Sequence, residues 1–167
     1  MALRHLVYEG SEDESLRATA RPVTKFDRRL KTLLGDMKDT MIHFGGIGIA
    51  APQVNVRRRV CIIGPFDDVI YEMVNPEIIE TEGEQEGYEG CLSVPGFIGR
   101  VKRPERVKVK CQDRNGGEQI YEFSGFSAVA ASHEIDHLDG IMYTDKAEDV
   151  HRPEDRPGEF DEEDEDE

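Results

Sequence analysis

The chain has 167 residues with a formal net charge of −15. This length suits one domain with a buried core and is short for two. Because no run approaches the roughly 18 apolar residues of a membrane span and the N-terminal residues lack a signal-peptide stretch, we expect a cytoplasmic protein without a membrane segment. Three cysteines are an odd number, so we expect no disulfide framework.

An amphipathic helix is expected near the N-terminus. Between residues 24 and 46 apolar residues recur at helical spacing, and most intervening residues are charged. Thr24 is a candidate N-cap, and Gly45 and Gly46 end the pattern. The segment GIGIAAPQV that follows is expected to be a loop or a short extended piece.

Several extended segments follow this helix. RRVCIIGP (58–65) and VIYEMVNPEII (69–79) are expected to be extended, the second interrupted by its Asn-Pro, and the acidic segment 80–90 is expected to be a loop. RVKVKCQD and EQIYEF flank RNGG (114–117), which predicts a β-hairpin. Alternation in the first of these strands places Cys111 in the core, and Cys61, in an apolar run, has the same interpretation.

A second helix is expected from Phe126 to Leu138, with small residues that allow close packing on a sheet. The pattern as a whole predicts an α+β fold, with mostly antiparallel strands packed around this helix. We place the domain at residues 1–147. Residues 148–167 contain 12 acidic residues and two arginines, so we expect a disordered acidic tail that serves solubility or a basic partner.

The second helix contains the motif HEIDH, residues 133–137. Histidines four apart lie on one helix face, where both can bind a metal, although the same residues could be ordinary helix positions. A catalytic metal usually takes three protein ligands. Tyr143 stands where the extended HExxHxxGxxH pattern needs a third histidine, and the downstream glutamates lie in the expected tail. Cys91, in the constrained segment EGCLSVPG, is the favoured third ligand, because a thiolate suits a borderline divalent metal.

Three segments, in this order and spacing, resemble the peptide deformylase family: GIGIAAPQ (46–53), EGCLS (89–93) and HEIDH (133–137). The resemblance extends over residues 1–147. It implies a metal-dependent hydrolase that removes the formyl group from the N-terminal formylmethionine of new polypeptides and releases formate. It also implies that Cys91, His133 and His137 bind the metal. Fe(II) is the metal expected in the cell, and zinc, nickel or cobalt are possible after purification.

Roles for further residues follow from the chemistry of amide hydrolysis. Glu134 is placed to accept a proton from water and return it to the departing amine. The resemblance implies that the Gln53 side-chain amide and the Leu92 backbone N–H stabilise the negative carbonyl oxygen.

We expect Ile47, Leu92 and Val129 to form an apolar slot for the methionine side chain. Gly48 would let the peptide backbone approach. Glu89 and Arg103 could form an ion pair that supports the Cys91 segment.

The sequence departs from the family pattern at Ser132, where many members have glutamine, and at Ile98, where bacterial members often have arginine. Many bacterial members of the family continue with a basic C-terminal helix that docks on ribosomes, whereas the C-terminal residues here are acidic. We therefore expect weak or transient ribosome contact and no specific nucleic-acid binding. The expected source is a bacterium or a bacterium infected by a virus. Two alternatives remain: a metallopeptidase of other specificity, and a catalytically impaired binding protein.

Overall fold

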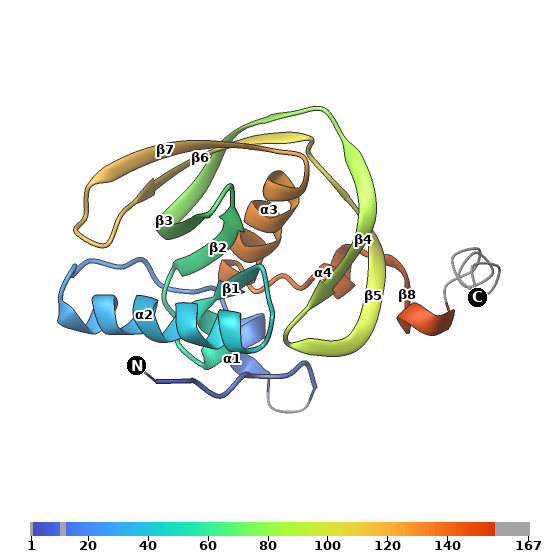
Figure 1. The fold of residues 1–167 in the computed structure, drawn as a ribbon, viewed down its shortest axis with the longest axis horizontal. Coiled ribbons are helices and arrows are strands. Elements are labelled where there is room, and N and C mark those ends of the chain that lie inside the picture. Colours follow the sequence, from blue (N-terminus) through green and yellow to red (C-terminus); the bar gives the residue numbers. More distant parts are fainter. Residues whose placement is uncertain (1, 11–12, 156–167) are drawn as a thin grey trace.

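The structure, a computed structural model, describes residues 2–10 and 13–155 (Figure 1). The helices are α1 (Glu14–Arg17), α2 (Arg28–His43), α3 (Phe126–Leu138) and α4 (Tyr143–Lys146), with 3-10 turns at Ala51–Val54 and Pro153–Asp155. The strands are β1 (Gly48–Ala50), β2 (Val60–Phe66), β3 (Val69–Glu82), β4 (Gln85–Cys91), β5 (Val94–Arg103), β6 (Arg106–Gln112), β7 (Glu118–Ser124) and β8 (Glu148–His151).

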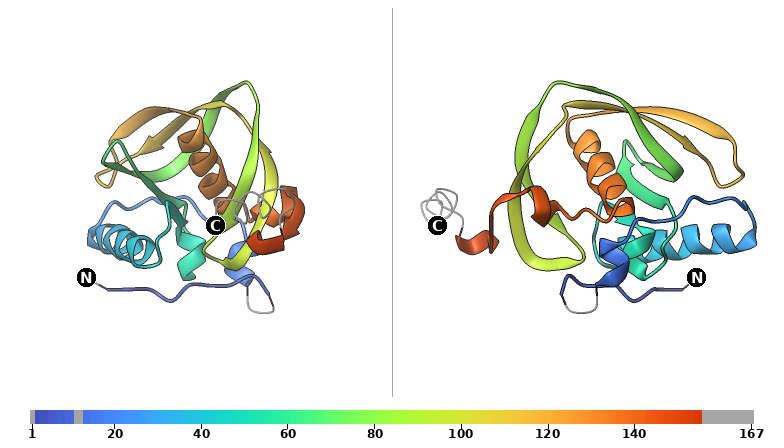
Figure 2. Two further views of the ribbon diagram at one scale, coloured as in Figure 1. Left: turned by 45° about the vertical axis from the view of Figure 1, so that its right-hand side comes forward. Right: turned by 180° about the vertical axis from the view of Figure 1, so that it is seen from behind.

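Two antiparallel sheets form around α3. The five-stranded sheet has the order β1-β2-β3-β6-β7, and the three-stranded sheet has the order β4-β5-β8. Helix α3 lies between them in all three ribbon views (Figures 1 and 2). The expected α+β architecture around the HEIDH helix is confirmed, and the bounds of α3 are those expected from the sequence.

The buried face of α3 explains its position. Ala128, Ala130, Ala131 and Leu138 are buried in one core cluster with residues of β2, β3, β6 and β7. Small side chains at three of these positions allow the helix to approach the sheet closely. Cys61 and Cys111 belong to the same cluster as free, buried thiols, which confirms their expected core role.

Helix α2 is amphipathic as expected but begins later than expected. Its N-cap is Asp27, whose side chain accepts a hydrogen bond from the Leu30 N–H, and not Thr24. Because the Asp27 carboxylate binds a backbone N–H that has no partner within the helix, α2 begins directly after Asp27. Leu30, Leu33, Leu34, Met37 and Met41 are buried against β1 and β2, and Gly45 follows the helix with a positive φ of 71°.

Two sequence-based expectations about the chain between the sheets are corrected. Strand β3 continues through Asn75, which has a φ of 50°, with a register shift against β6 between Val74 and Glu77. The segment 80–90, expected to be a loop, completes β3 and forms β4, which pairs with β5 from Gln85 to Cys91. Pairing with β5 stabilises β4 as a strand, although its acidic composition favours a loop.

The expected tail is also corrected. Residues 148–151 form β8, in which Ile98 of β5 pairs with His151 and Arg100 with Glu148. The first residues of the expected disordered tail therefore form a strand, which joins the second sheet. The remainder of the expected tail, residues 156–167, lies outside the described residues. In the described part of the chain, none of the helices has the length and apolar character needed to cross a membrane.

Candidate active site

Cys91, His133 and His137 converge between the two sheets. One potential ligand atom from each lies within 4.8 Å of the others, and the Cys91 Sγ is 3.4 Å from the His137 Nε2. The histidines project from one face of α3, and Cys91 ends β4 in a tight connection to Val94 of β5. The structure thus brings together the three residues that the sequence selected from distant segments.

A chain of ion pairs holds His133 in place. Its Nδ1 lies 2.8 Å from the Glu89 Oε1, and Arg103 donates two hydrogen bonds to the Glu89 carboxylate, at 2.8 and 2.9 Å. The Arg103 guanidinium also donates to the Asp136 Oδ2 at 2.6 Å. The expected ion pair between Glu89 and Arg103 is confirmed. Because Nδ1 is engaged, Nε2 is the ring nitrogen of His133 that remains for a ligand.

Sequence reasoning missed the contacts that Asp136 makes with Arg103 and Lys146. Asp136 lies inside the HEIDH motif, but only the fold reveals that it turns toward Arg103 and that the Lys146 Nζ of α4 lies 2.9 Å from the same carboxylate oxygen. A carboxylate one residue before a candidate ligand was the signal available in the sequence.

The environment shifts the pKa values of two carboxyl groups at this site. Burial would raise the pKa of Glu89, but hydrogen bonds from Arg103 and His133 outweigh it and lower this pKa to about 2. Glu89 is therefore an anion at neutral pH. Burial raises the pKa of Glu134 to about 7, so this carboxyl group exchanges a proton near neutrality.

Burial lowers the pKa of His137 well below its usual value, and the charges of His133, Arg103 and Arg17 act in the same direction. The His137 ring is therefore neutral, which is the form that binds a metal.

Gln53 is oriented by a short local hydrogen bond. Its Oε1 accepts from the Ala50 N–H at 2.9 Å, so the amide nitrogen points the other way. This Nε2 donates to the Ser93 Oγ at 3.1 Å and lies 3.5 Å from the Cys91 Sγ. Gln53 is buried in the 3-10 turn Ala51–Val54, which has Pro52 in its first positions. Ser93, also missed by sequence reasoning, thus helps to fix the Gln53 side chain beside Cys91, His133 and His137, which we call the ligand cluster.

Glu134 packs directly against Gly48. A β-carbon on Gly48 would lie 2.9 Å from both the Cδ and the Cγ of Glu134, which is closer than real contacts allow. Glycine at this position therefore makes room for the carboxylate of the chain itself, in addition to the role toward a peptide expected from the sequence. Among the described residues, the Glu134 Oε1 is buried without a hydrogen-bond partner.

A cavity of about 400 Å³ opens onto this cluster. Its volume is within the range of small-molecule sites. Its lining contains Gln53, Cys91, His133 and Glu134 together with Ile47, Gly48, Leu92 and Val129, and His137 is buried outside the lining. Phe97 and Phe126 contribute exposed rings to the same lining, and neither was selected from the sequence.

The structure also places three other residues that the sequence singled out: Tyr143, Ser132 and Ile98. The Tyr143 ring stacks on His133 with centroids 5.9 Å apart, and its hydroxyl donates to the Phe97 carbonyl at 3.3 Å. Ser132 is buried on α3, and among the described residues its Oγ has no partner. Ile98 is absent from the lining of the cavity and pairs with His151 instead.

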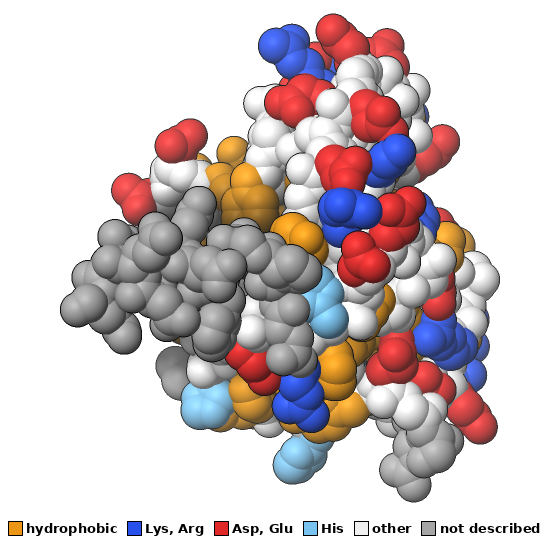
Figure 3. All heavy atoms as spheres, turned by 90° about the vertical axis from the view of Figure 1, so that its right-hand side faces the viewer, with side chains coloured by type: hydrophobic (Ala, Val, Ile, Leu, Met, Phe, Trp, Pro, Cys, Tyr) orange, Lys and Arg blue, Asp and Glu red, His pale blue; other side chains and the backbone are white. Residues whose placement is uncertain are grey.

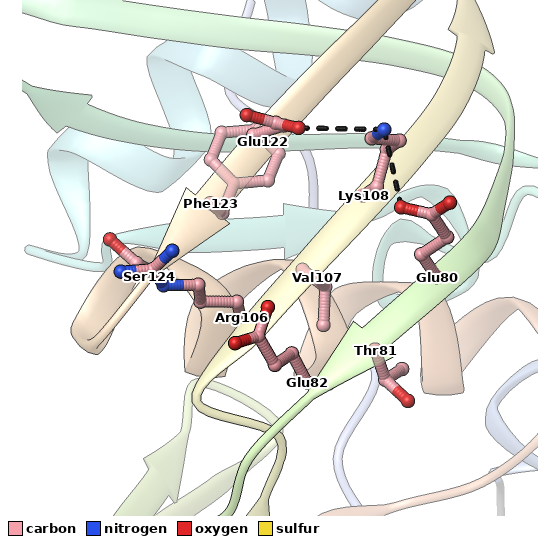
Figure 4. Close-up of a pocket in the computed structure, with 9 residues that line it drawn as sticks. All are labelled: Glu80, Thr81, Glu82, Arg106, Val107, Lys108, Glu122, Phe123 and Ser124. Carbon is pink, nitrogen blue, oxygen red and sulfur yellow. Dashed lines mark ion pairs between the residues drawn. The ribbon is translucent and has the colours of Figure 1, made fainter.

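A second cavity, of about 490 Å³, is lined by residues of β3, β6 and β7 (Figure 4), none of which lines the cavity at the ligand cluster. Among its charged groups Lys108 is paired, since its Nζ lies 3.2 Å from Glu80 and 3.5 Å from Glu122. It contains no histidine or cysteine. The ligand cluster, although its cavity is smaller, is where chemistry is concentrated.

The residues present fit a divalent metal. Two imidazoles and one thiol form a donor set that suits borderline metals. The partner of His133 Nδ1 is a carboxylate, the arrangement that orients metal-binding histidines. The unpaired Glu134 oxygen beside these donors leaves a carboxylate ready to act on a bound molecule.

Comparison with known proteins identifies the family. The family model described as polypeptide deformylase matches residues 6–153. A peptide deformylase of Heliobacterium modesticaldum is 52% identical over 136 residues, covering 81% of this chain and 89% of that protein.

Solved structures give the same result. A peptide deformylase from Legionella pneumophila superimposes with a TM-score of 0.84 at 42% identity, covering 88% of this chain and 87% of the other. The peptide deformylase from Thermus thermophilus gives 0.82 at 40% identity, covering 86% and 84%. The chain therefore belongs to the peptide deformylase family.

Proposed function

We propose that this protein is a metal-dependent hydrolase that removes the formyl group from the N-terminal formylmethionine of newly made polypeptides and releases formate. The observation that carries the proposal is the convergence of Cys91, His133 and His137 beside Glu134, in a chain of this family. The alternative of a metallopeptidase has no such family support, and an impaired binding protein would not need a buried, unpaired Glu134.

We propose Cys91, His133 and His137 as the metal ligands, with Fe(II) as the metal in the cell. The close approach of their ligand atoms supports this assignment, as does the Glu89 carboxylate on the His133 Nδ1. Zinc, nickel and cobalt suit the same donors and are candidates in purified protein. When bound, the metal would polarise the formyl oxygen and lower the pKa of water at the site.

Glu134 is proposed as the proton carrier. Its buried carboxylate lies beside the proposed metal ligands, where it can accept a proton from the attacking water and return that proton to the leaving amine nitrogen. Gly48 keeps this carboxylate in place by leaving the space that a larger residue would fill.

Gln53 and Leu92 are proposed to stabilise the negative oxygen that forms on the formyl carbon. The Gln53 amide is held by Ala50 and Ser93 before any substrate binds, so its N–H groups need little reorganisation. The Leu92 backbone N–H lies one residue beyond Cys91 at the same cavity. Preorganised donors of this kind are each worth about 3 to 4 kcal/mol in the transition state.

The substrate is proposed to lie along β1. This strand pairs with β2 and is an edge of its sheet, so an extended peptide can add to the other side. Ile47, Leu92 and Val129 supply apolar contacts for a methionine side chain in the adjoining cavity. We propose a cytoplasmic location, where formylated chains are made in bacteria, and weak or transient ribosome contact because the C-terminal segment is acidic.

Two peptides test the function against its main alternative. The metal-loaded protein is incubated with formyl-Met-Ala-Ser and with the same peptide lacking the formyl group. We expect formate from the first and no new amine from the second. Cleavage of the unformylated peptide would favour a metallopeptidase, and no reaction of either peptide would favour a binding protein.

A further inference from the structure

A cluster of arginines lies at the start of α2, on a protein that is otherwise strongly acidic. Arg4, Arg28, Arg29 and Arg58 line a cavity of about 390 Å³ together with Thr32, Leu33 and Val56. We call these four arginines the arginine surface. They come from three separate segments of the chain, so the fold gathers charge that the sequence disperses.

Most of this charge is not neutralised. Arg28, Arg29 and Arg58 make no side-chain ion pair or hydrogen bond with any residue in the described ranges, and only Arg4 has a partner, the Asp36 carboxylate at 2.9 Å. On the face of β4, β5 and β8, by contrast, acidic and basic side chains lie next to one another (Figure 3). There Arg100 pairs with Glu86 at 2.8 Å and with Glu148 at 2.9 Å.

The position of two of these arginines is unfavourable for the helix itself. Arg28 and Arg29 occupy the first turn of α2, directly after Asp27, whose carboxylate caps the helix. Positive charge opposes the dipole at the N-terminal end of a helix, where an anion is favoured. Beyond the Asp27 carboxylate, this helix end therefore carries two cations that a bound polyanion would neutralise.

We propose that the arginine surface binds the phosphate backbone of RNA, independently of base sequence. Arginine presents a planar set of donors that matches phosphate oxygens, and several unpaired guanidiniums around one concave surface suit a chain of phosphates. The choice of RNA rests on the proposed function, because newly made polypeptides emerge from ribosomes, whose surface is rich in RNA. This surface supplies the weak ribosome contact proposed above.

The geometry leaves the active site accessible. Helix α2 has 16 residues, which at 1.5 Å per residue separate its two ends by about 24 Å. Arg28 and Arg29 of the arginine surface lie in its first turn, and Arg4 lies farther along it beside Asp36, whereas Gly45 and Gly46, just beyond its last turn, line the active-site cavity. Strand β8, with which the acidic C-terminal segment begins, lies at the opposite end of the molecule from the start of α2 (Figures 1 and 2). RNA bound at the arginine surface would therefore face neither the active-site cavity nor the acidic C-terminal segment.

Two double variants with the same charge change test the proposal. Arg28→Gln/Arg58→Gln removes two charges from the arginine surface. Lys102→Gln/Arg106→Gln removes two exposed cations that also have no ion-pair partner within the described residues. Binding of a fluorescent structured RNA to the full-length protein is measured by anisotropy between 50 and 200 mM salt.

We expect the first variant to weaken RNA binding at least about tenfold and to lower the slope of log K against log salt by about two. The second variant should bind within about twofold of wild type. An equal loss in both variants, or no RNA binding by wild type at the lowest salt, would overturn the proposal. Binding to vesicles containing anionic lipid in place of RNA would also overturn it.

The same variants separate this proposal from the proposed function. Formate release from a free formyl-Met peptide should be unchanged in both, because neither pair touches the active-site cavity. RNA binding is measured without substrate, so failure of the RNA experiment and failure of deformylation are observed independently.

Discussion

Replacing Glu89 by glutamine should destabilise the protein by about 3 kcal/mol at neutral pH. Glu89 and Arg103 are nearly inaccessible, with side-chain exposures of 6% and 3%, and are joined by two hydrogen bonds. Breaking a buried ion pair by removing one partner costs about 3 to 5 kcal/mol, and the Asp136 carboxylate that still contacts Arg103 places the cost at the lower end. The pKa of Glu89 gives the same figure, because lowering it from 4.5 to about 2 corresponds to about 3 kcal/mol.

The sign of the pH dependence follows from the lowered pKa. The stabilisation is fully present above about pH 4.5, the ordinary value, and is lost as the pH falls toward 2. Urea unfolding of metal-free wild type and Glu89→Gln should therefore differ by about 3 kcal/mol at pH 7 and by about 2 kcal/mol near pH 3.5. The control is Glu86→Gln on the same strand, whose half-exposed ion pair with Arg100 should contribute at most about 1 kcal/mol. The reasoning is refuted if the two variants lose the same stability.

Three further predictions concern the site and the core. Cys91→Ser should weaken zinc binding at least about tenfold in a chelator competition, because serine remains protonated at neutral pH; unchanged affinity would exclude the thiolate as a ligand. Gly48→Ala should lower kcat by about 10²-fold, since its methyl group displaces Glu134, while melting temperature and metal content change little; full activity would contradict the packing argument. Burial raises the pKa of Cys111 to about 12, so the unfolding free energy should fall as the pH rises above about 9. In Cys111→Val this fall should be less steep by about 1.4 kcal/mol per pH unit. The same slope in the variant and in wild type would contradict the burial of the Cys111 thiol.

The sequence was most informative where a pattern has a physical period or a fixed spacing. The 3.6-residue period located α3, and the alternation around RNGG located the β6–β7 hairpin and the burial of Cys111. The histidine spacing and the setting of Cys91 identified three residues that the fold brings within 4.8 Å. These features are local, so the chain carries them without reference to distant contacts.

The features that sequence reasoning missed depend on pairing between distant segments. The acidic residues of β4 become a strand only because β5 lies beside them, and residues 148–151 do so for the same reason. The contact of Arg103 with Asp136 likewise joins a strand to a helix 33 positions later. No periodicity within either segment encodes such contacts, and a composition rich in charge favoured loop or disorder.

The central claim is that Glu134 carries protons for formyl hydrolysis beside a metal held by Cys91, His133 and His137. The most direct measurement compares wild type and Glu134→Gln, both loaded with Fe(II) without oxygen, for bound metal and for formate released from a formyl-Met peptide. We predict equal metal content and a loss of formate release of at least about 10²-fold in the variant. Formate release at the wild-type rate by the metal-loaded variant would contradict the account.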